Sequence, residues 1–185
     1  MPRTLLFFGL LTLSGCAKVA TELDRLPAPT RQGLATAGWL LNGQAHVPLR
    51  SDSSAEEPVA GYWEKTPVGC SLSLVLRELS RDGQQGLSLF LPDIQRAGTY
   101  ALDRTPTRGR DSDVSNVAYG QYYSTRLADP NGVTGPNAPG QLVITCFDTV
   151  RNVVAGTFSI NLRVAGDGTP LVITYGRFDV HLTRR

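Results

Sequence analysis

Residues 71–79, Ser-Leu-Ser-Leu-Val-Leu-Arg-Glu-Leu, decide the fold class of this chain. Leu72, Leu74 and Leu76 recur at every second position, and Cys70 continues the same phase. Successive side chains of a β-strand point to opposite faces, so this alternation predicts a strand with one buried face. A turn over residues 81–86 follows, and it predicts a hairpin with the next apolar run.

The rest of the chain repeats this pattern of short strands and turns. Further strands are expected at residues 39–41, 44–49, 62–66, 87–91, 98–102, 117–128, 141–147, 153–164, 171–175 and 177–182. Asn42-Gly43 predicts a tight hairpin because both residues tolerate positive φ, while residues 129–140 are expected to lack regular structure. Strands at this spacing predict an all-β fold, a single antiparallel β-sandwich or β-barrel-like domain, and periodicity does not separate these two.

The N-terminus carries a second informative stretch, Leu13-Ser14-Gly15-Cys16. It follows Arg3 and an apolar run over residues 4–13, which is too short for a membrane-spanning helix of about 20 residues. The tetrapeptide resembles the processing site of bacterial lipoproteins. That resemblance implies that residues 1–15 are a signal peptide and that Cys16 carries a diacylglycerol and an N-acyl chain such as palmitate. The alternative is an ordinary cleavage site beside a chance cysteine.

The residues after Cys16 suggest where the protein is held. Ala17-Lys18 offers neither an aspartate that would suggest inner-membrane retention nor an acidic run that would suggest surface display. We therefore expect a lipid-anchored protein of the cell outer membrane that faces the periplasm. Residues 16–36 are expected to be the lipidated N-terminus and a tether, partly extended by prolines. Residues 37–185 are expected to form the β domain, whose length indicates one domain.

The charge balance and the cysteines limit the function further. The chain has 185 residues and a formal net charge of +2, which gives no electrostatic case for binding nucleic acid.

With Cys16 lipidated, Cys70 and Cys146 remain as a candidate disulfide in an oxidising periplasm. Closing that loop would stabilise the fold by roughly 4 kcal/mol in the chain-entropy model. Two buried free thiols are the alternative.

Metal-binding patterns are weak in this sequence. His46 and His181 are the two histidines, and we expect both on the surface, since a zinc site needs more ligands at characteristic spacing. Residues 111–116 are similar to the start of a calcium loop, but Asn116 stands where that loop needs glycine. We expect a solvated loop there, and no metal or cofactor.

Catalytic patterns are equally weak. A glycosidase needs two carboxylates at a set separation, and nothing singles out a pair among Glu64, Glu78 and Asp93. An aromatic sugar-binding platform could be built from Trp39, Trp63, Tyr119, Tyr122 and Tyr123. Aromatic residues on strands more often pack in the core. The protein is therefore not expected to be an enzyme.

Short motifs at both ends of the chain carry a resemblance. Leu26-Pro27-Ala28-Pro29-Thr30 precedes Gly38, Asn42-Gly43 and Val47-Pro48, and residues 154–159 and 173–179 contain Gly-Thr-Phe and Gly-Arg-Phe-Asp. These motifs resemble an uncharacterised family of Bacteroidetes-type lipoproteins. The family has no known activity, so the resemblance brings no catalytic residues, and neither Cys70 nor Cys146 belongs to its pattern.

Together these features predict a lipid-anchored envelope protein that is non-catalytic. Its membrane contact would be the lipid on Cys16, and its domain would bind another envelope protein or play a structural role. The alternative is a small-molecule or glycan-binding β domain. An unrecognised hydrolase is the third hypothesis.

Overall fold

The structure, a computed structural model, describes residues 20–49, 57–67, 69–80, 83–106, 116–125, 132–164 and 168–185. As predicted, this part of the chain is nearly all β, with one 3-10 helix, η1, before the strands. The elements are η1 (Glu22–Arg25), β1 (Thr36–Leu41), β2 (Gln44–His46), β3 (Val59–Thr66), β4 (Gly69–Ser80), β5 (Gly83–Leu91), β6 (Gly98–Leu102), β7 (Tyr119–Ser124), β8 (Gly132–Val133), β9 (Gly140–Asp148), β10 (Val153–Val164) and β11 (Pro170–Arg184). None of the described residues forms a helix long and apolar enough to cross a membrane.

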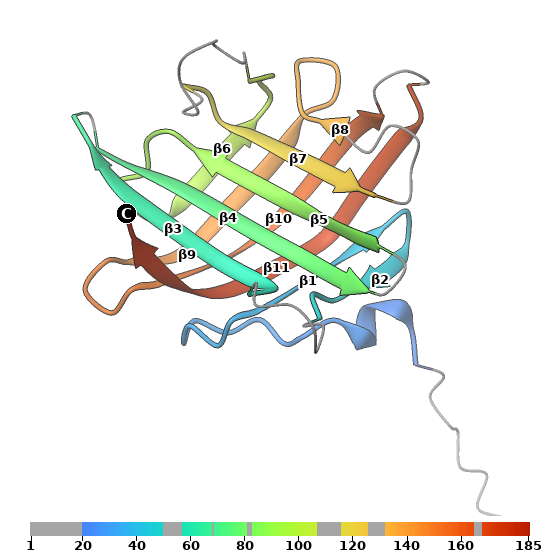
Figure 1. The fold of residues 1–185 in the computed structure, drawn as a ribbon, viewed down its shortest axis with the longest axis horizontal. Coiled ribbons are helices and arrows are strands. Elements are labelled where there is room, and N and C mark those ends of the chain that lie inside the picture. The colour runs from blue at the N-terminus through green and yellow to red at the C-terminus, as the bar shows by residue number, and fades with distance from the viewer. Residues whose placement is uncertain are drawn as a thin grey trace, which may run out of the picture.

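The strands form two layers that face each other. Figure 1 shows β3, β4, β5 and β7 side by side in front, with β9, β10 and β11 crossing behind them. β1 and β2 extend the rear layer beyond β11, and β6 extends it beyond β9. Asn42 and Gly43 have φ values of 49° and 86°, which confirms the tight hairpin between β1 and β2.

The two layers are continuous at both sides. At one side, the end of β11 pairs in parallel with β3, with Leu182 opposite Gly61. At the other, the two-residue strand β8 pairs with both β7 and β10. The domain is therefore a barrel-like sandwich. Its sheet is mixed, because the β3–β11 pair is parallel where an antiparallel sheet was expected, while the other pairings described are antiparallel.

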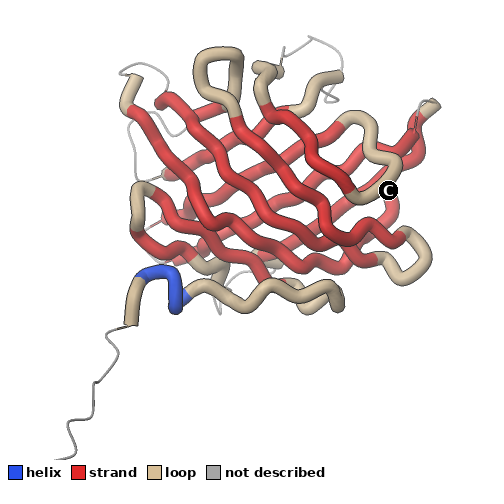
Figure 2. Tube along the Cα trace, turned by 180° about the vertical axis from the view of Figure 1, so that it is seen from behind, coloured by secondary structure: helices blue, strands red, loops and turns tan. Residues whose placement is uncertain are grey.

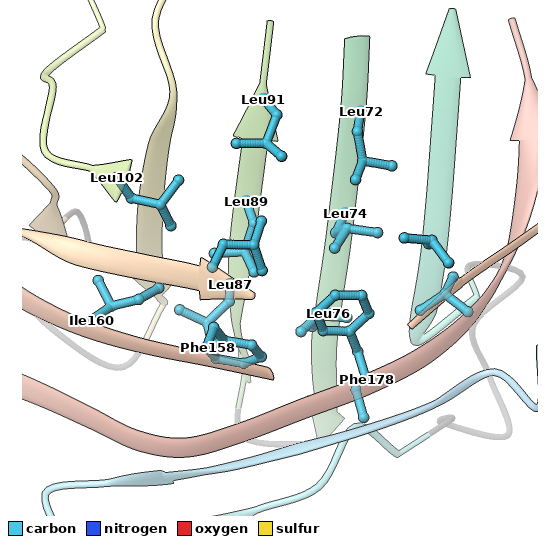
Figure 3. Close-up of a cluster of buried hydrophobic side chains, with 14 of the residues drawn as sticks. Leu72, Leu74, Leu76, Leu87, Leu89, Leu91, Leu102, Phe158, Ile160 and Phe178 are labelled. Atoms are coloured by element: carbon cyan, nitrogen blue, oxygen red, sulfur yellow. The ribbon is translucent and has the colours of Figure 1, made fainter. Parts of the chain in front are cut away.

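Leucines from the front layer fill the space between the layers. Figure 3 shows the leucines of β4 and β5 pointing toward Phe158, Ile160 and Phe178 of the rear layer. Leu72, Leu74 and Leu76 are each 1% exposed or less, so the alternation of residues 71–79 marks the core as predicted. Burying one such side chain contributes about 1.5–3 kcal/mol.

Two glycines of the rear layer make room for two phenylalanines. Gly156 of β10 lies opposite Phe178 of β11, and Phe158 of β10 lies opposite Gly176 of β11. A Cβ atom on Gly176 would fall 2.4 Å from the Phe158 ring. One on Gly156 would fall 2.1 Å from the Val143 carbonyl oxygen and 2.9 Å from the Phe178 ring. The two rings pack side by side, with centroids 6.3 Å apart. Each ring thus lies over the glycine of the neighbouring strand.

Three connections differ from the expectation. The turn expected at residues 81–86 is shorter, because β5 already begins at Gly83. Residues 129–140 were expected to lack regular structure, but they contain β8, because two residues suffice to join β7 to β10. Residues 171–175 and 177–182 were expected as two strands, but they are parts of β11. β11 remains continuous through a bulge, since its pairing with β10 shifts between Phe158 and Ile160.

The segment expected to be a tether lies against the domain over much of its length. Figure 2 shows η1 and the residues after it running along one end of the sandwich. The side chain of Glu22 accepts a hydrogen bond of 2.7 Å from the Ala45 backbone N–H of β2. Leu26 is buried, and Pro27 lies where a Cβ on Gly38 would fall. The packed domain therefore includes residues that precede position 37.

The glycine–phenylalanine pairs predict a large effect from one added methyl group. Gly176→Ala should lower the free energy of unfolding by about 1–3 kcal/mol, because the Phe158 ring occupies the space that the methyl group needs. Gly98→Ala on β6 is the matched control, since its Cβ would meet the nearest side-chain atom at an ordinary 3.8 Å. Urea unfolding measures both, and equal stability of the two variants would contradict the proposed constraint.

Candidate functional site

A groove lies on the outer face of the rear layer, among the residues that the structure describes. It has a volume of about 440 Å³ and crosses β9, β10 and β11, with Pro29 from the N-terminal segment at its edge. Gln141 and Val143 of β9 and Thr157 and Ser159 of β10 contribute outward-facing side chains. Tyr175, Gly176 and Arg177 of β11 complete the lining, and the buried Phe158 contributes to it from below.

The bulge in β11 aims Tyr175 outward beside this groove. Tyr175 has a φ of 53° and its side chain is 61% exposed. A bulky residue in the left-handed region costs of order 1–3 kcal/mol, and such strain is concentrated at functional sites. Bulges also re-aim side chains next to binding sites. The backbone conformation of Tyr175 is therefore our strongest local indication that this groove has a function.

A buried carboxylate fastens the N-terminal segment that forms one edge of the groove. Asp179 of β11 is 1% exposed and accepts a hydrogen bond of 2.5 Å from the Thr30 hydroxyl. The backbone N–H groups of Gln32 and Gly33 donate to the same carboxylate at 2.9 and 2.7 Å. Arg177 adds a hydrogen bond from Nη1 to the Pro27 carbonyl, at 3.1 Å. These contacts hold residues 27–33 against β11.

The hydrogen bonds also set the charge state of Asp179. Burial by itself raises the pKa of this carboxyl, but the donors from Thr30, Gln32 and Gly33 stabilise the charged form more and lower its pKa below the ordinary value. Successive backbone N–H groups that converge on an anion form a nest. Asp179 therefore remains ionised although it is buried.

The lining of the groove offers groups for recognition. Tyr175 presents an aromatic face and a hydroxyl, and Arg177 presents a guanidinium with several donors. Gln141, Thr157 and Ser159 add an amide and two hydroxyls, each able to donate and to accept. Aromatic residues and arginine are enriched at binding hot spots. The arrangement can bind a polar or mixed surface by hydrogen bonds and ring contact.

The residues singled out from the sequence are scattered. Cys16, the expected lipidation site, lies outside the described residues. Cys70 on β4 and Cys146 on β9 are free, half-buried thiols, so the tentative disulfide is not formed in the structure. β4 and β9 belong to opposite layers and are not neighbours in the sheet.

The two histidines also lie apart. His181 is exposed on β11, as expected, but His46 is half-buried, contrary to the expectation of a surface position. Its Nδ1 atom lies 2.9 Å from the Glu78 carboxylate, and its ring stacks on the buried Trp39 ring. Gln85 donates to the same carboxylate at 2.7 Å. His46 is partly buried because this polar group covers one end of the core.

Glu64 and Glu78 do not form a carboxylate pair, and the five aromatic residues do not gather as one platform. Glu64 lies opposite Ser71, near the start of β4, whereas Glu78 lies near its end, about 23 Å farther along at 3.3 Å per residue. Among the described residues, no group of three potential metal ligands occurs. The calcium-like loop lies outside them except for Asn116. Three of the five aromatic residues, Trp39, Trp63 and Tyr122, are buried in the core. The other two, Tyr119 and Tyr123, face outward from β7.

Sequence reasoning missed the groove, although a signal for it exists. The apolar positions of β11 are odd-numbered at Leu171 and Ile173 and even-numbered from Phe178 onward. A strand with period 2 can change phase only through an extra residue, so this shift locates a bulge around residues 174–176.

No known protein family, curated protein or solved structure matches the chain.

The Asp179 contacts predict a change in acid stability. Folding lowers the pKa of Asp179, so its ionised carboxylate stabilises the folded state. This contribution to the free energy of unfolding is complete above the pKa of the unfolded chain, about 3.9, and is lost as the pH falls through the lower pKa of the folded state. Asp179→Asn should therefore destabilise the protein by about 1–3 kcal/mol at pH 7 and less at pH 3. Urea unfolding between pH 3 and 7 measures this.

The exposed Asp93 provides the control for this series. Asp93→Asn should leave the stability near that of the wild type across the same pH range. A destabilisation by Asp179→Asn that is independent of pH would contradict the role assigned to the charge of Asp179.

Proposed function

We propose that this protein is a lipid-anchored component of the cell envelope that binds another envelope protein through the groove beside Tyr175. The observation that carries the proposal is the exposed Tyr175 side chain, held by a left-handed backbone conformation, over a groove of about 440 Å³. A backbone strain of this size persists only when the surrounding structure holds it in place. Here the bulge in β11 presents an aromatic ring and Arg177 on one face.

The chemistry of the groove favours recognition over catalysis. Its polar side chains are hydroxyls, an amide and a guanidinium, which donate and accept hydrogen bonds at fixed positions. The exposed aromatic ring adds apolar contact area at a low cost in conformational entropy, since a tyrosine has two side-chain torsions. Both properties are typical of protein-binding surfaces.

The lipid anchor belongs to the same proposal. The sequence Leu13-Ser14-Gly15-Cys16 supports it, together with the basic residue and the short apolar run before it. Two or more acyl chains give stable anchoring without any membrane-binding face on the domain. An outer-membrane position facing the periplasm would then place the groove among other envelope proteins.

Metabolic labelling tests the anchor. In a Gram-negative host grown with radioactive palmitate, the wild-type chain should be labelled and recovered with the outer-membrane fraction. Cys16→Ser should abolish the label and leave an unprocessed precursor, whereas Cys70→Ser should be labelled normally. Labelling of the Cys16→Ser variant would contradict anchoring at this residue.

Photo-crosslinking tests the groove. A photoreactive amino acid in place of Tyr175 should give one reproducible adduct with an envelope protein in intact cells. The same amino acid at Val150, which is 90% exposed in the turn after β9, is the control and should not give it. Ser159→Arg, which fills the groove from β10, should abolish the adduct. Equal adducts from positions 175 and 150 would contradict a specific site.

A further inference from the structure

A row of side chains crosses the outer face of the front layer, on the opposite side of the domain from the Tyr175 groove. Tyr62 of β3, Ser73 of β4, Phe90 of β5 and Tyr119 of β7 are successive partners in the sheet register. Their chain neighbours Trp63, Leu72, Leu74, Leu89 and Leu91 are buried in the core. Because side chains alternate along a strand, the row itself faces outward.

The row contains a gap flanked by aromatic rings. Tyr62 and Phe90 lie two strands apart, which corresponds to about 10 Å between backbones at 4.7–4.9 Å per strand. The small side chain of Ser73 lies between them, and the Phe90 and Tyr119 rings continue the wall with centroids 5.6 Å apart. A ring placed over Ser73 could contact both aromatic walls at ordinary distances of about 3.5–4.0 Å.

The gap is a small groove whose floor and rim are polar. Its volume is about 160 Å³, well below the roughly 300–1,000 Å³ of pockets for drug-sized ligands, so it suits a single ring. Ser71 and Ser73 line the floor, and Glu64 and Arg185 lie at the rim. The Arg185 guanidinium lies over one face of the Tyr62 ring, 4.0 Å from its centroid, which places the guanidinium beside the gap.

We propose that this groove binds one ring of a neutral pyranose sugar. The C–H face of such a ring would pack against Tyr62 and Phe90, while its hydroxyls would meet the serine hydroxyls, the Glu64 carboxylate and the Arg185 guanidinium. A carboxylate accepts and a guanidinium donates, so the pair suits groups that do both, as sugar hydroxyls do. The rim carries one negative side chain, Glu64, and one positive side chain, Arg185. Because these charges balance, the rim has no net side-chain charge to attract an ionic ligand, which favours an uncharged one.

An apolar ring, such as a phenylalanine side chain of a peptide, fits this groove less well. It would cover Ser71, Ser73 and Glu64 without offering them a hydrogen bond. Leaving a buried polar group unpaired costs about 1–3 kcal/mol. A sugar ring of similar thickness satisfies the same groups, so the polar floor decides between the two occupants.

Calorimetric titration of the purified full chain with glucose, N-acetylglucosamine, maltose and cellobiose tests the proposal. At least one of these sugars should bind saturably, and Tyr62→Ala and Phe90→Ala should each weaken binding at least tenfold. Ser73→Gln, a substitution on the outer face that fills the gap, should abolish binding without removing an aromatic side chain. Tyr123→Ala is the matched control, since Tyr123 lies on β7 opposite Gly86, outside the groove, and it should bind as the wild type does.

Several results would overturn the proposal. The first is that none of the four sugars binds, and the second is that both aromatic variants bind with unchanged affinity. The third is that a phenylalanine-containing peptide displaces a bound sugar at a lower concentration than that of the sugar. Tighter binding of glucuronate than of glucose would overturn the neutral class. Thermal unfolding midpoints establish whether each variant is folded. If an alanine variant does not fold, the Ser73→Gln variant still tests the proposal.

Discussion

The reciprocal packing of Phe158 over Gly176 and of Phe178 over Gly156 is the contact on which the rear layer depends. Side chains in a protein interior are close-packed, so two rings can face each other here only if each opposite residue lacks a Cβ atom. The phenylalanines then close the core against the leucines of β4 and β5 (Figure 3). The short motifs Gly-Thr-Phe and Gly-Arg-Phe-Asp contain these four residues, which explains their composition by packing.

The same stretch of β11 organises the outer face. Beyond Gly176, side chains alternate, so Phe178 enters the core while Arg177 and Asp179 face outward. Asp179 fastens the Thr30 segment and Arg177 binds the Pro27 carbonyl. The motif Leu-Pro-Ala-Pro-Thr near the N-terminus is thus hydrogen-bonded to the motif Gly-Arg-Phe-Asp near the C-terminus. The residues of these two motifs that make these contacts therefore serve to hold the fold together.

Local patterns allowed the fold class to be predicted, and long-range contacts account for what was missed. The alternation of residues 71–79 and the pair Asn42-Gly43 act over a few residues, and both expectations are confirmed. β8 was missed because its two residues become a strand only when β7 and β10 lie on either side. The residues expected to form a tether gave no sign of packing, since their partner Asp179 lies about 150 positions away in the chain. The groove is not predicted, because residues 171–175 and 177–182 are expected as two separate strands and the phase shift within β11 is then not apparent.

The fastening of the N-terminal segment has a consequence for the proposed anchor. η1 begins at Glu22, and Glu22 is already hydrogen-bonded to β2. If Cys16 carries lipid, only residues 17–21 lie between the membrane and the packed domain. The six residue steps from Cys16 to Glu22 span at most about 22 Å at 3.3–3.6 Å each. The domain would therefore stay close to the bilayer, with the end that bears η1 toward it (Figure 2). Both candidate grooves lie on side faces of the sandwich, so this orientation would leave them open to partners that approach along the membrane.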